Sequence, residues 1–154
     1  MWKTLAGVPI PDVLSELRRL ATDETRELHI GTDAKHRGAC TDFVTVIALV
    51  MPEYGWRVFY RGERTPRSPS LAHQLFHEVE LSLATATTVA EALGLPITVH
   101  VDANEDQRHR SSRYVQALAG MVSGYGFDVR VKPEAWCATH VADFVVKEKN
   151  TRAA

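Results

Sequence analysis

The sequence predicts an α/β protein with a mixed five-stranded sheet, in which a three-strand antiparallel meander is followed by alternating helices and strands. Three observations support this fold class. Residues 28–63 contain three runs rich in β-branched and aromatic side chains, joined by connections short enough for hairpins. From residue 71 the apolar spacing changes to that of a helix. Strand-like and helix-like segments then alternate, an order that places helices on the faces of one sheet.

An extra N-terminal helix is expected over residues 11–21, ahead of the meander. Its apolar residues recur at helical spacing, and Pro11 followed by Asp12 is a helix start signal. The three meander strands are expected at residues 28–33, 42–51 and 56–63. The third of these alternates apolar side chains with arginines, which indicates one solvent-facing side.

The longest predicted helix follows the meander, with Ser68 as N-cap, Pro69 at the first helical position and Gly94 as its end. Its apolar stripe has seven members: Leu71, Leu75, Val79, Leu83, Ala86, Ala90 and Leu93. Further strands are expected at residues 96–104 and 127–133, and further helices at 111–126 and 139–150, the last capped by Thr139.

Composition indicates one ordinary globular domain over residues 1–150, with residues 151–154 as a loose tail. The chain has 154 residues, of which 45% are apolar and 24% charged. It has no apolar run long enough for a membrane span and no signal-peptide pattern, so we expect a cytoplasmic protein without a membrane partner. The formal net charge of −1 argues against non-specific binding of duplex nucleic acid.

Two carboxylates fall at the ends of predicted strands. Asp33 ends the first meander strand, and Asp102 ends the strand at 96–104. In the predicted sheet these strands are parallel neighbours, so the two side chains are expected side by side, where they repel each other unless a cation compensates. Taken singly, each residue is also compatible with a turn or cap.

Two more acids complete the candidate cluster. Glu78 lies beside the apolar stripe of the long helix, and Asp143 lies in the first turns of the last helix. The alternatives are a solvated helix surface for Glu78 and a favourable interaction with the helix N-terminus for Asp143. Carboxylate clusters of this kind suit Mg²⁺ or Mn²⁺, and two such ions can support phosphodiester hydrolysis.

The chain resembles the ribonuclease-H-like superfamily, and specifically a bacterial family of predicted ribonuclease-H-like proteins of unknown function. The likeness runs from about residue 28 to residue 147, and five pieces carry it: "IGTD", "DFVTVIAL", "HEVELSL", "VHVDAN" and "KPEAWCATHVADFVVK". The predicted order of elements matches that fold.

The resemblance implies a two-metal site with Mg²⁺ or Mn²⁺, which activates water and leaves a 5′-phosphate and a 3′-hydroxyl. It implies that Asp33, Glu78, Asp102 and Asp143 are the catalytic acids. Ala34 stands where ribonucleases H usually carry glycine, which disfavours an RNA–DNA hybrid. We therefore expect a metal-dependent nuclease acting on RNA or single-stranded DNA. The alternative is a non-catalytic module that binds nucleic acid or protein.

Several basic and aromatic residues near the predicted site have two interpretations. The basic residues are interpreted either as phosphate ligands or as solvated surface. They are Arg108, Arg110, Arg113 and Lys132, together with the group Arg61, Arg64 and Arg67. His140 is a candidate proton shuttle or an exposed first-turn histidine. Trp136 either stacks on a base or belongs to the core.

A zinc site is a further alternative, with the ligand set His36, Cys40, Cys137 and His140. Its two halves lie nearly a hundred residues apart, unlike the compact knuckles of most structural zinc sites. Packed thiols and surface imidazoles are therefore favoured. His73 and His77, one helical turn apart, lack the glutamate of a helical zinc motif and are expected at the surface.

Overall fold

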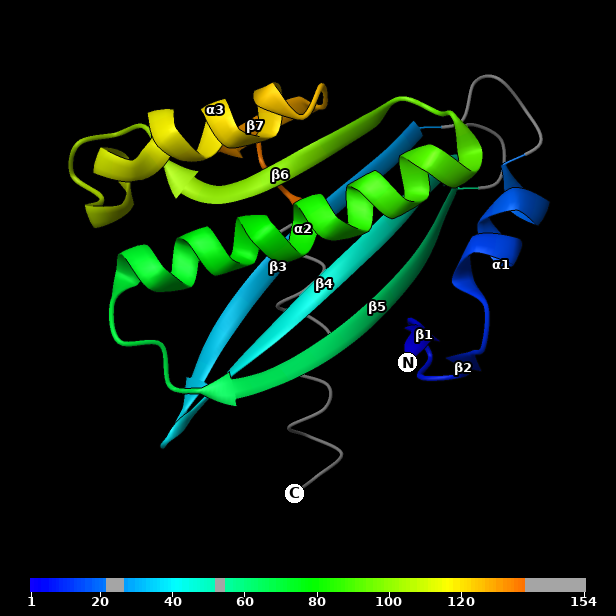
Figure 1. The fold of residues 1–154 in the computed structure, drawn as a ribbon, viewed down its shortest axis with the longest axis horizontal. Coiled ribbons are helices and arrows are strands. Elements are labelled where there is room, and N and C mark those ends of the chain that lie inside the picture. The colour runs from blue at the N-terminus through cyan, green and yellow to red at the C-terminus, as the bar shows by residue number, and fades with distance from the viewer. Residues whose placement is uncertain (22–26, 52–54, 138–154) are drawn as a thin grey trace.

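The computed structural model describes residues 1–21, 27–51 and 55–137. Its strands form one seven-stranded sheet with the order β2-β1-β5-β4-β3-β6-β7 (Figure 1). In chain order the elements are β1 (Trp2–Thr4), β2 (Pro9–Ile10), α1 (Val13–Leu20), β3 (Glu27–Arg37), β4 (Cys40–Met51), β5 (Gly55–Pro66), α2 (Leu71–Leu93), β6 (Ile97–Asn104), a 3₁₀ turn (Arg110–Tyr114), α3 (Val115–Gly124) and β7 (Asp128–Lys132).

The predicted meander and the strands that follow it are confirmed, but the predicted end of the first strand at Asp33 is wrong. β3 continues to Arg37, because its pairing with β4 runs past Asp33 to the pair Arg37 and Cys40. β3, β4 and β5 pair antiparallel, β6 joins β3 in parallel, and β7 joins β6 in parallel. The sheet nevertheless has seven strands, so the predicted number of five is wrong. Residues 2–10 fold into a small hairpin whose first strand pairs with β5, with Lys3 opposite Tyr60. This hairpin occupies the otherwise open edge of β5, where unpaired backbone groups are available.

The helix starts differ in detail from the predicted ones. Asp12 is the N-cap of α1, since its side chain accepts a hydrogen bond from the Ser15 backbone N–H, so Pro11 precedes the cap. The predicted cap Ser68 is wrong for α2. Its N-cap is Ser70, whose side chain accepts from the His73 backbone N–H, while the Ser68 N–H donates to Thr41 Oγ1 at 2.9 Å. Gly94 ends α2 as predicted, with a left-handed φ of 68°.

The third helical segment is divided into two parts. The predicted helix over residues 111–126 is a 3₁₀ turn at Arg110–Tyr114 followed by α3, which ends at Gly124. The predicted last helix at 139–150 and the tail at 151–154 lie outside the described residues. No helix of the described part is long and apolar enough to cross a membrane.

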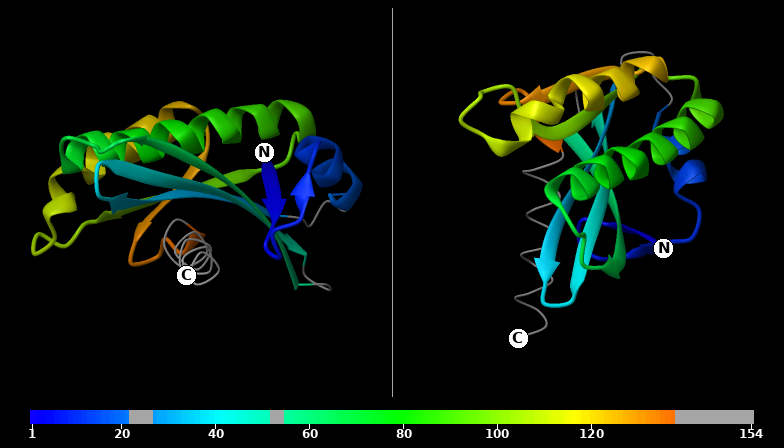
Figure 2. Two further views of the ribbon diagram at one scale, coloured as in Figure 1. Left: turned by 90° about the horizontal axis from the view of Figure 1, so that it is seen from below. Right: turned by 60° about the vertical axis from the view of Figure 1, so that its left-hand side comes forward.

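The main core lies between the sheet and the three described helices. α2 and α3 lie along one face of the sheet (Figure 2), and α1 contributes Val13 and Leu17 to the same core. Representative members from each layer are Ile30, Ile47, Val79, Val99 and Leu118, all buried. A smaller cluster consists of Val44, Val46, Ala48, Tyr60 and Cys137, with Val58 and Trp136 packed against it. This cluster is separate from the main core, as expected for the opposite face of a sheet that carries apolar side chains on both faces.

Candidate metal centre

Asp33 and Asp102 are brought together by the parallel pairing of β3 and β6. The last paired residues of this ladder are Gly31 and His100. Each aspartate stands two residues beyond that pair, at the same distance along its own strand. The predicted adjacency of the two carboxylates is thus a direct consequence of the register between these two strands.

Glu78 comes to the same place from α2. It is three residues after Leu75 and next to Val79, both buried, so its side chain belongs to the face of α2 that covers the sheet. Only 2% of Glu78 is exposed, which excludes the solvated-surface alternative. One carboxylate oxygen each from Asp33, Glu78 and Asp102 lies within 4.8 Å of the other two. We call these three residues the acid cluster.

Glu78 is the most perturbed member of the acid cluster. Burial raises its pKa well above the ordinary 4.5, and the negative charges of Asp102 and Asp33 raise it further. A weak hydrogen bond from Gln74 Nε2 to Glu78 Oε1, at 3.4 Å, and the positive charge of Lys132 act in the opposite direction. Glu78 Oε2 is buried and has no hydrogen-bond partner among the described residues. A buried oxygen of this kind is costly unless a ligand satisfies it.

Asp102 already has a positively charged neighbour. Lys132 Nζ lies 2.5 Å from Asp102 Oδ1, and the two side chains are 35% and 15% exposed. Lys132 ends β7, the parallel neighbour of β6, so the sheet topology places it beside the acid cluster. Its positive charge offsets part of the repulsion among the three acids. Asp33 Oδ1 accepts a hydrogen bond from the backbone N–H of Ala34.

The donor set fits a hard divalent cation. It consists only of carboxylate oxygens, and it includes one buried oxygen that lacks a partner in the described part of the chain. Mg²⁺ and Mn²⁺ prefer such oxygens and keep waters in their remaining positions. The three acids can therefore hold at least one such ion, with Glu78 as the group that gains most from it.

A network of buried hydroxyl groups lies next to the acid cluster. Thr32 Oγ1 lies 2.7 Å from Ser82 Oγ and 3.0 Å from Thr45 Oγ1. Thr32 precedes Asp33, and Ser82 is one helical turn after Glu78, so the Thr32–Ser82 bond connects two of the three elements that carry the acids, β3 and α2. Sequence reasoning missed this network, although the serine four residues after a site glutamate was a usable signal.

A buried histidine pair was also missed. His29 and His100 are 3% and 2% exposed, and His29 Nδ1 lies 2.9 Å from His100 Nε2. His100 Nδ1 accepts from the backbone N–H groups of Trp136 and Cys137, so its proton is on Nε2 and is donated to His29. His29 Nε2 is then left to donate to Glu27. Burial lowers the pKa of His29 and, together with the neighbouring His29, lowers that of His100 to about 3.

Trp136 belongs to this buried environment. Its ring lies 4.7 Å from that of His29, 4.6 Å from that of His100 and 4.6 Å from that of Trp56, measured between centroids. This packing agrees with the core interpretation of Trp136. The histidine pair thereby holds the chain segment that follows Lys132 against β6.

The predicted phosphate ligands take three different positions. Arg108 is bound by its neighbour Asp106 at 2.5 Å, and Lys132 pairs with Asp102. Arg110 and Arg113 are exposed and line a hollow of about 360 Å³ beside the N-terminus of α2. Within the other basic group, Arg64 pairs with Asp42, and Arg67 donates to the Gly38 carbonyl.

The remaining predicted site residues are either outside the described chain or apart from the acid cluster. His140 and Asp143 fall in the former class, so their roles stay predictions. His36 binds Thr41 Oγ1, and Cys137 is buried, with a raised pKa caused by that burial. Among residues 1–21, 27–51 and 55–137, no metal-compatible group includes His36, Cys40 or Cys137. His77 lies 3.0 Å from Glu63 at the surface.

A family comparison places the chain among proteins with the predicted fold. The ribonuclease H-like family model matches residues 12–147. The chain belongs to the ribonuclease H-like family. Among functionally curated proteins, none matches its sequence.

Two solved structures are similar to this chain at low sequence identity. Ribonuclease H1 of the halophilic archaeon Halobacterium salinarum NRC-1 is 17% identical, with 79% of this chain and 98% of that chain covered and a TM-score of 0.44. The N-terminal ribonuclease H domain of a Mycobacterium tuberculosis protein is 11% identical, with 84% and 100% covered and a TM-score of 0.41.

Proposed function

We propose that this chain is a divalent-metal-dependent nuclease whose site is the acid cluster, with RNA or single-stranded DNA as substrate. The observation that carries the proposal is the convergence of half-buried Asp33 and Asp102 with buried Glu78, in a member of the ribonuclease H-like family. Three carboxylates within 4.8 Å of one another are a strained arrangement for a purely structural role.

The roles of the protein groups follow from their surroundings. Asp33 and Asp102, at matched positions on β3 and β6, hold the metal, and Glu78 contributes its buried oxygen from α2. Asp143 is the proposed fourth ligand. When bound, Mg²⁺ or Mn²⁺ supplies charge neutralisation and activation of water for attack on a phosphodiester. Lys132 holds Asp102 in place until the cation enters. His140 remains a proposed proton shuttle.

The substrate strand is proposed to run from the acid cluster toward the N-terminus of α2. Leu71, the first residue of α2, is seven residues from Glu78, which corresponds to about 10 Å along the helix axis. Exposed Arg110 and Arg113 lie beside that end of α2. Together with the helix N-terminus, they provide positive charge for a phosphate adjacent to the one being cleaved.

The test is cleavage of labelled oligonucleotides in Mn²⁺ or Mg²⁺ by the parent chain and by Asp33→Asn and Asp102→Asn. Each substitution keeps the side-chain shape and removes the metal-binding charge, so a loss of at least a hundredfold is expected. Asp128→Asn, an exposed aspartate on β7, is the matched control and retains the activity. RNA, single-stranded DNA and hybrid duplexes form the substrate panel. Undiminished cleavage by both aspartate variants contradicts the assignment.

The Lys132–Asp102 ion pair is the observation that favours the alternative, a non-catalytic nucleic-acid-binding module. An internal cation compensates one acid without any metal. This alternative expects no turnover with any divalent ion and strand binding that is unaffected by Asp33→Asn. Isothermal titration with Mn²⁺, followed by a strand-binding assay with each variant, distinguishes the two functions.

A further inference from the structure

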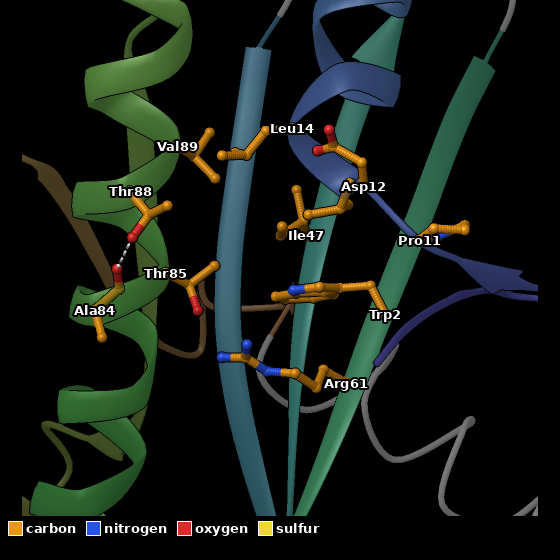
Figure 3. Close-up of a pocket in the computed structure, with 11 residues that line it drawn as sticks. Trp2, Pro11, Asp12, Leu14, Ile47, Arg61, Ala84, Thr85, Thr88 and Val89 are labelled. Carbon is orange, nitrogen blue, oxygen red and sulfur yellow. Dashed lines mark hydrogen bonds between the residues drawn. The ribbon is translucent and has the colours of Figure 1, made fainter.

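A second hollow lies between α2, the meander and the N-terminal segment, away from the acid cluster. Its volume is about 330 Å³, equal to roughly eleven water molecules and within the range of small-ligand sites. The lining comes from β1, α1, β4, β5 and α2 (Figure 3). The lining residues that matter for recognition are Trp2, Leu14, Ile47, Arg61, Thr85 and Val89.

One side of the hollow carries a cation held against an aromatic ring. The guanidinium carbon of Arg61 lies 4.9 Å from the centroid of the Trp2 ring. Figure 3 shows the Arg61 side chain extending beneath that ring, toward α2. Among the ion pairs of the described residues, none involves Arg61. Its hydrogen-bonding fork is thus available to an anion.

A buried hydroxyl on the same hollow lacks a partner. Thr85 is 6% exposed, and its Oγ1 makes no hydrogen bond to any described residue. Two other polar side chains of the lining already make hydrogen bonds. Asp12 accepts from Ser15 as the α1 cap, and Thr88 Oγ1 donates to the Ala84 carbonyl. The polar groups of the lining that have no hydrogen bond to a described residue are therefore the Arg61 guanidinium, the Thr85 hydroxyl and the Trp2 indole N–H.

We propose that this hollow binds a small carboxylate with a compact apolar or aromatic body. The carboxylate accepts hydrogen bonds from the Arg61 fork and from Thr85 Oγ1. The body of the ligand packs on the apolar side chains of Leu14, Ile47 and Val89. Arg61 repels a cationic group at its end of the hollow, whereas the Asp12 carboxylate, bonded to Ser15, lies on the other side of the Trp2 ring (Figure 3). A fully polar ligand gains nothing from the apolar wall.

This site is independent of the proposed nuclease function. Thr85 is seven residues from Glu78, about 10 Å along the helix axis, and no residue of the acid cluster lines the hollow. Its expected ligand bears one carboxylate on roughly ten to fifteen non-hydrogen atoms, given the volume available. Success or failure of the nuclease assay leaves this proposal unaffected.

The experiment is titration of the full chain, in the presence of EDTA, with 3-phenylpropionate and with its neutral analogue 3-phenylpropanol. Binding is followed by two-dimensional ¹H–¹⁵N NMR. We expect saturable shifts at Thr85, Val89 and Trp2 with the carboxylate, and at least tenfold weaker binding of the alcohol. Arg61→Gln abolishes the preference for the carboxylate. Arg57→Gln, an exposed arginine on the same strand outside the hollow, preserves it.

A second variant tests the Thr85 hydroxyl without changing Arg61. Thr85→Val keeps the shape of the side chain and removes the hydroxyl, so we expect carboxylate binding to weaken several-fold while alcohol binding holds or improves. The proposal is overturned if millimolar 3-phenylpropionate causes no shifts at the hollow. It is equally overturned if carboxylate and alcohol bind alike, or if Arg61→Gln binds the carboxylate as the parent does.

Discussion

Replacing Glu78 by glutamine is expected to stabilise the metal-free protein, and to do so more at high pH than at low pH. In the folded chain, burial and two neighbouring aspartates raise the pKa of Glu78 above 4.5. The folded state therefore binds a proton that the unfolded state releases, and the carboxyl's contribution to stability is lost as the pH rises from 4.5 through the folded pKa. Glutamine has the shape of the protonated acid and carries no such dependence.

The gain in stability expected from Glu78→Gln has an upper bound that is set by the pH. Keeping the carboxyl protonated costs about 1.4 kcal/mol for each pH unit above its ordinary pKa, so the penalty at pH 7 is at most about 3.4 kcal/mol and at pH 5 at most about 0.7 kcal/mol. At about 2–4 °C per kcal/mol for a chain of this size, Glu78→Gln gains at most about 14 °C in Tm at pH 7 and at most about 3 °C at pH 5.

The assay is thermal or urea unfolding of both proteins in EDTA from pH 5 to pH 8, followed by circular dichroism. Taking the difference between the two proteins at each pH removes the contributions of all other groups. In Mn²⁺ the parent is expected to be the more stable of the two proteins. The ion stabilises the parent by binding its folded state, and the glutamine variant loses that stabilisation. A difference that stays constant from pH 5 to pH 8, or a variant that is less stable at pH 8 in EDTA, refutes the argument.

Three further predictions test the surroundings of the acid cluster. Lys132→Met removes the ammonium that competes with metal for Asp102, so calorimetry is expected to show tighter Mn²⁺ binding; weaker binding contradicts that competition. His100 has a pKa of about 3 in the folded chain, so stability falls by about 1.4 kcal/mol per pH unit below 6.5, and His100→Gln reduces that slope in acid unfolding curves. Thr85→Val replaces a buried hydroxyl that lacks a described partner by a methyl group and is expected to raise the free energy of unfolding by about 1 kcal/mol; a loss in urea denaturation contradicts it.

Much of the acid cluster follows from local pattern and topology. Asp33 lies within β3 and Asp102 near the end of β6, each two residues beyond the last parallel pair. The order of elements makes those strands parallel neighbours, so the adjacency of the two aspartates is predictable from the sequence. Glu78 shares a helix face with Leu75 and Ser82, three residues before it and four residues after it, and both are buried. Hydrophobic periodicity carries this information since it reports which side of each element is buried.

Other features depend on contacts between distant residues. Ser68 and Ser70 are equally good caps by residue type, and the hydrogen bond from the Ser68 N–H to Thr41 selects the later one. The strands β1 and β2 have three and two residues, too few for a recognisable alternation, and they exist because β5 offers an edge to pair with.

The sequence by itself determined the order of the strands β3 to β7 and of the helices between them, and the positions of the acids along those elements, because both depend on periodicity. Only the tertiary structure decided how deeply Glu78 is buried, that Lys132 reaches Asp102, and that His29 meets His100. Those outcomes depend on side-chain distances of a few ångströms across neighbouring elements, and pKa values and ion pairs change steeply over that range.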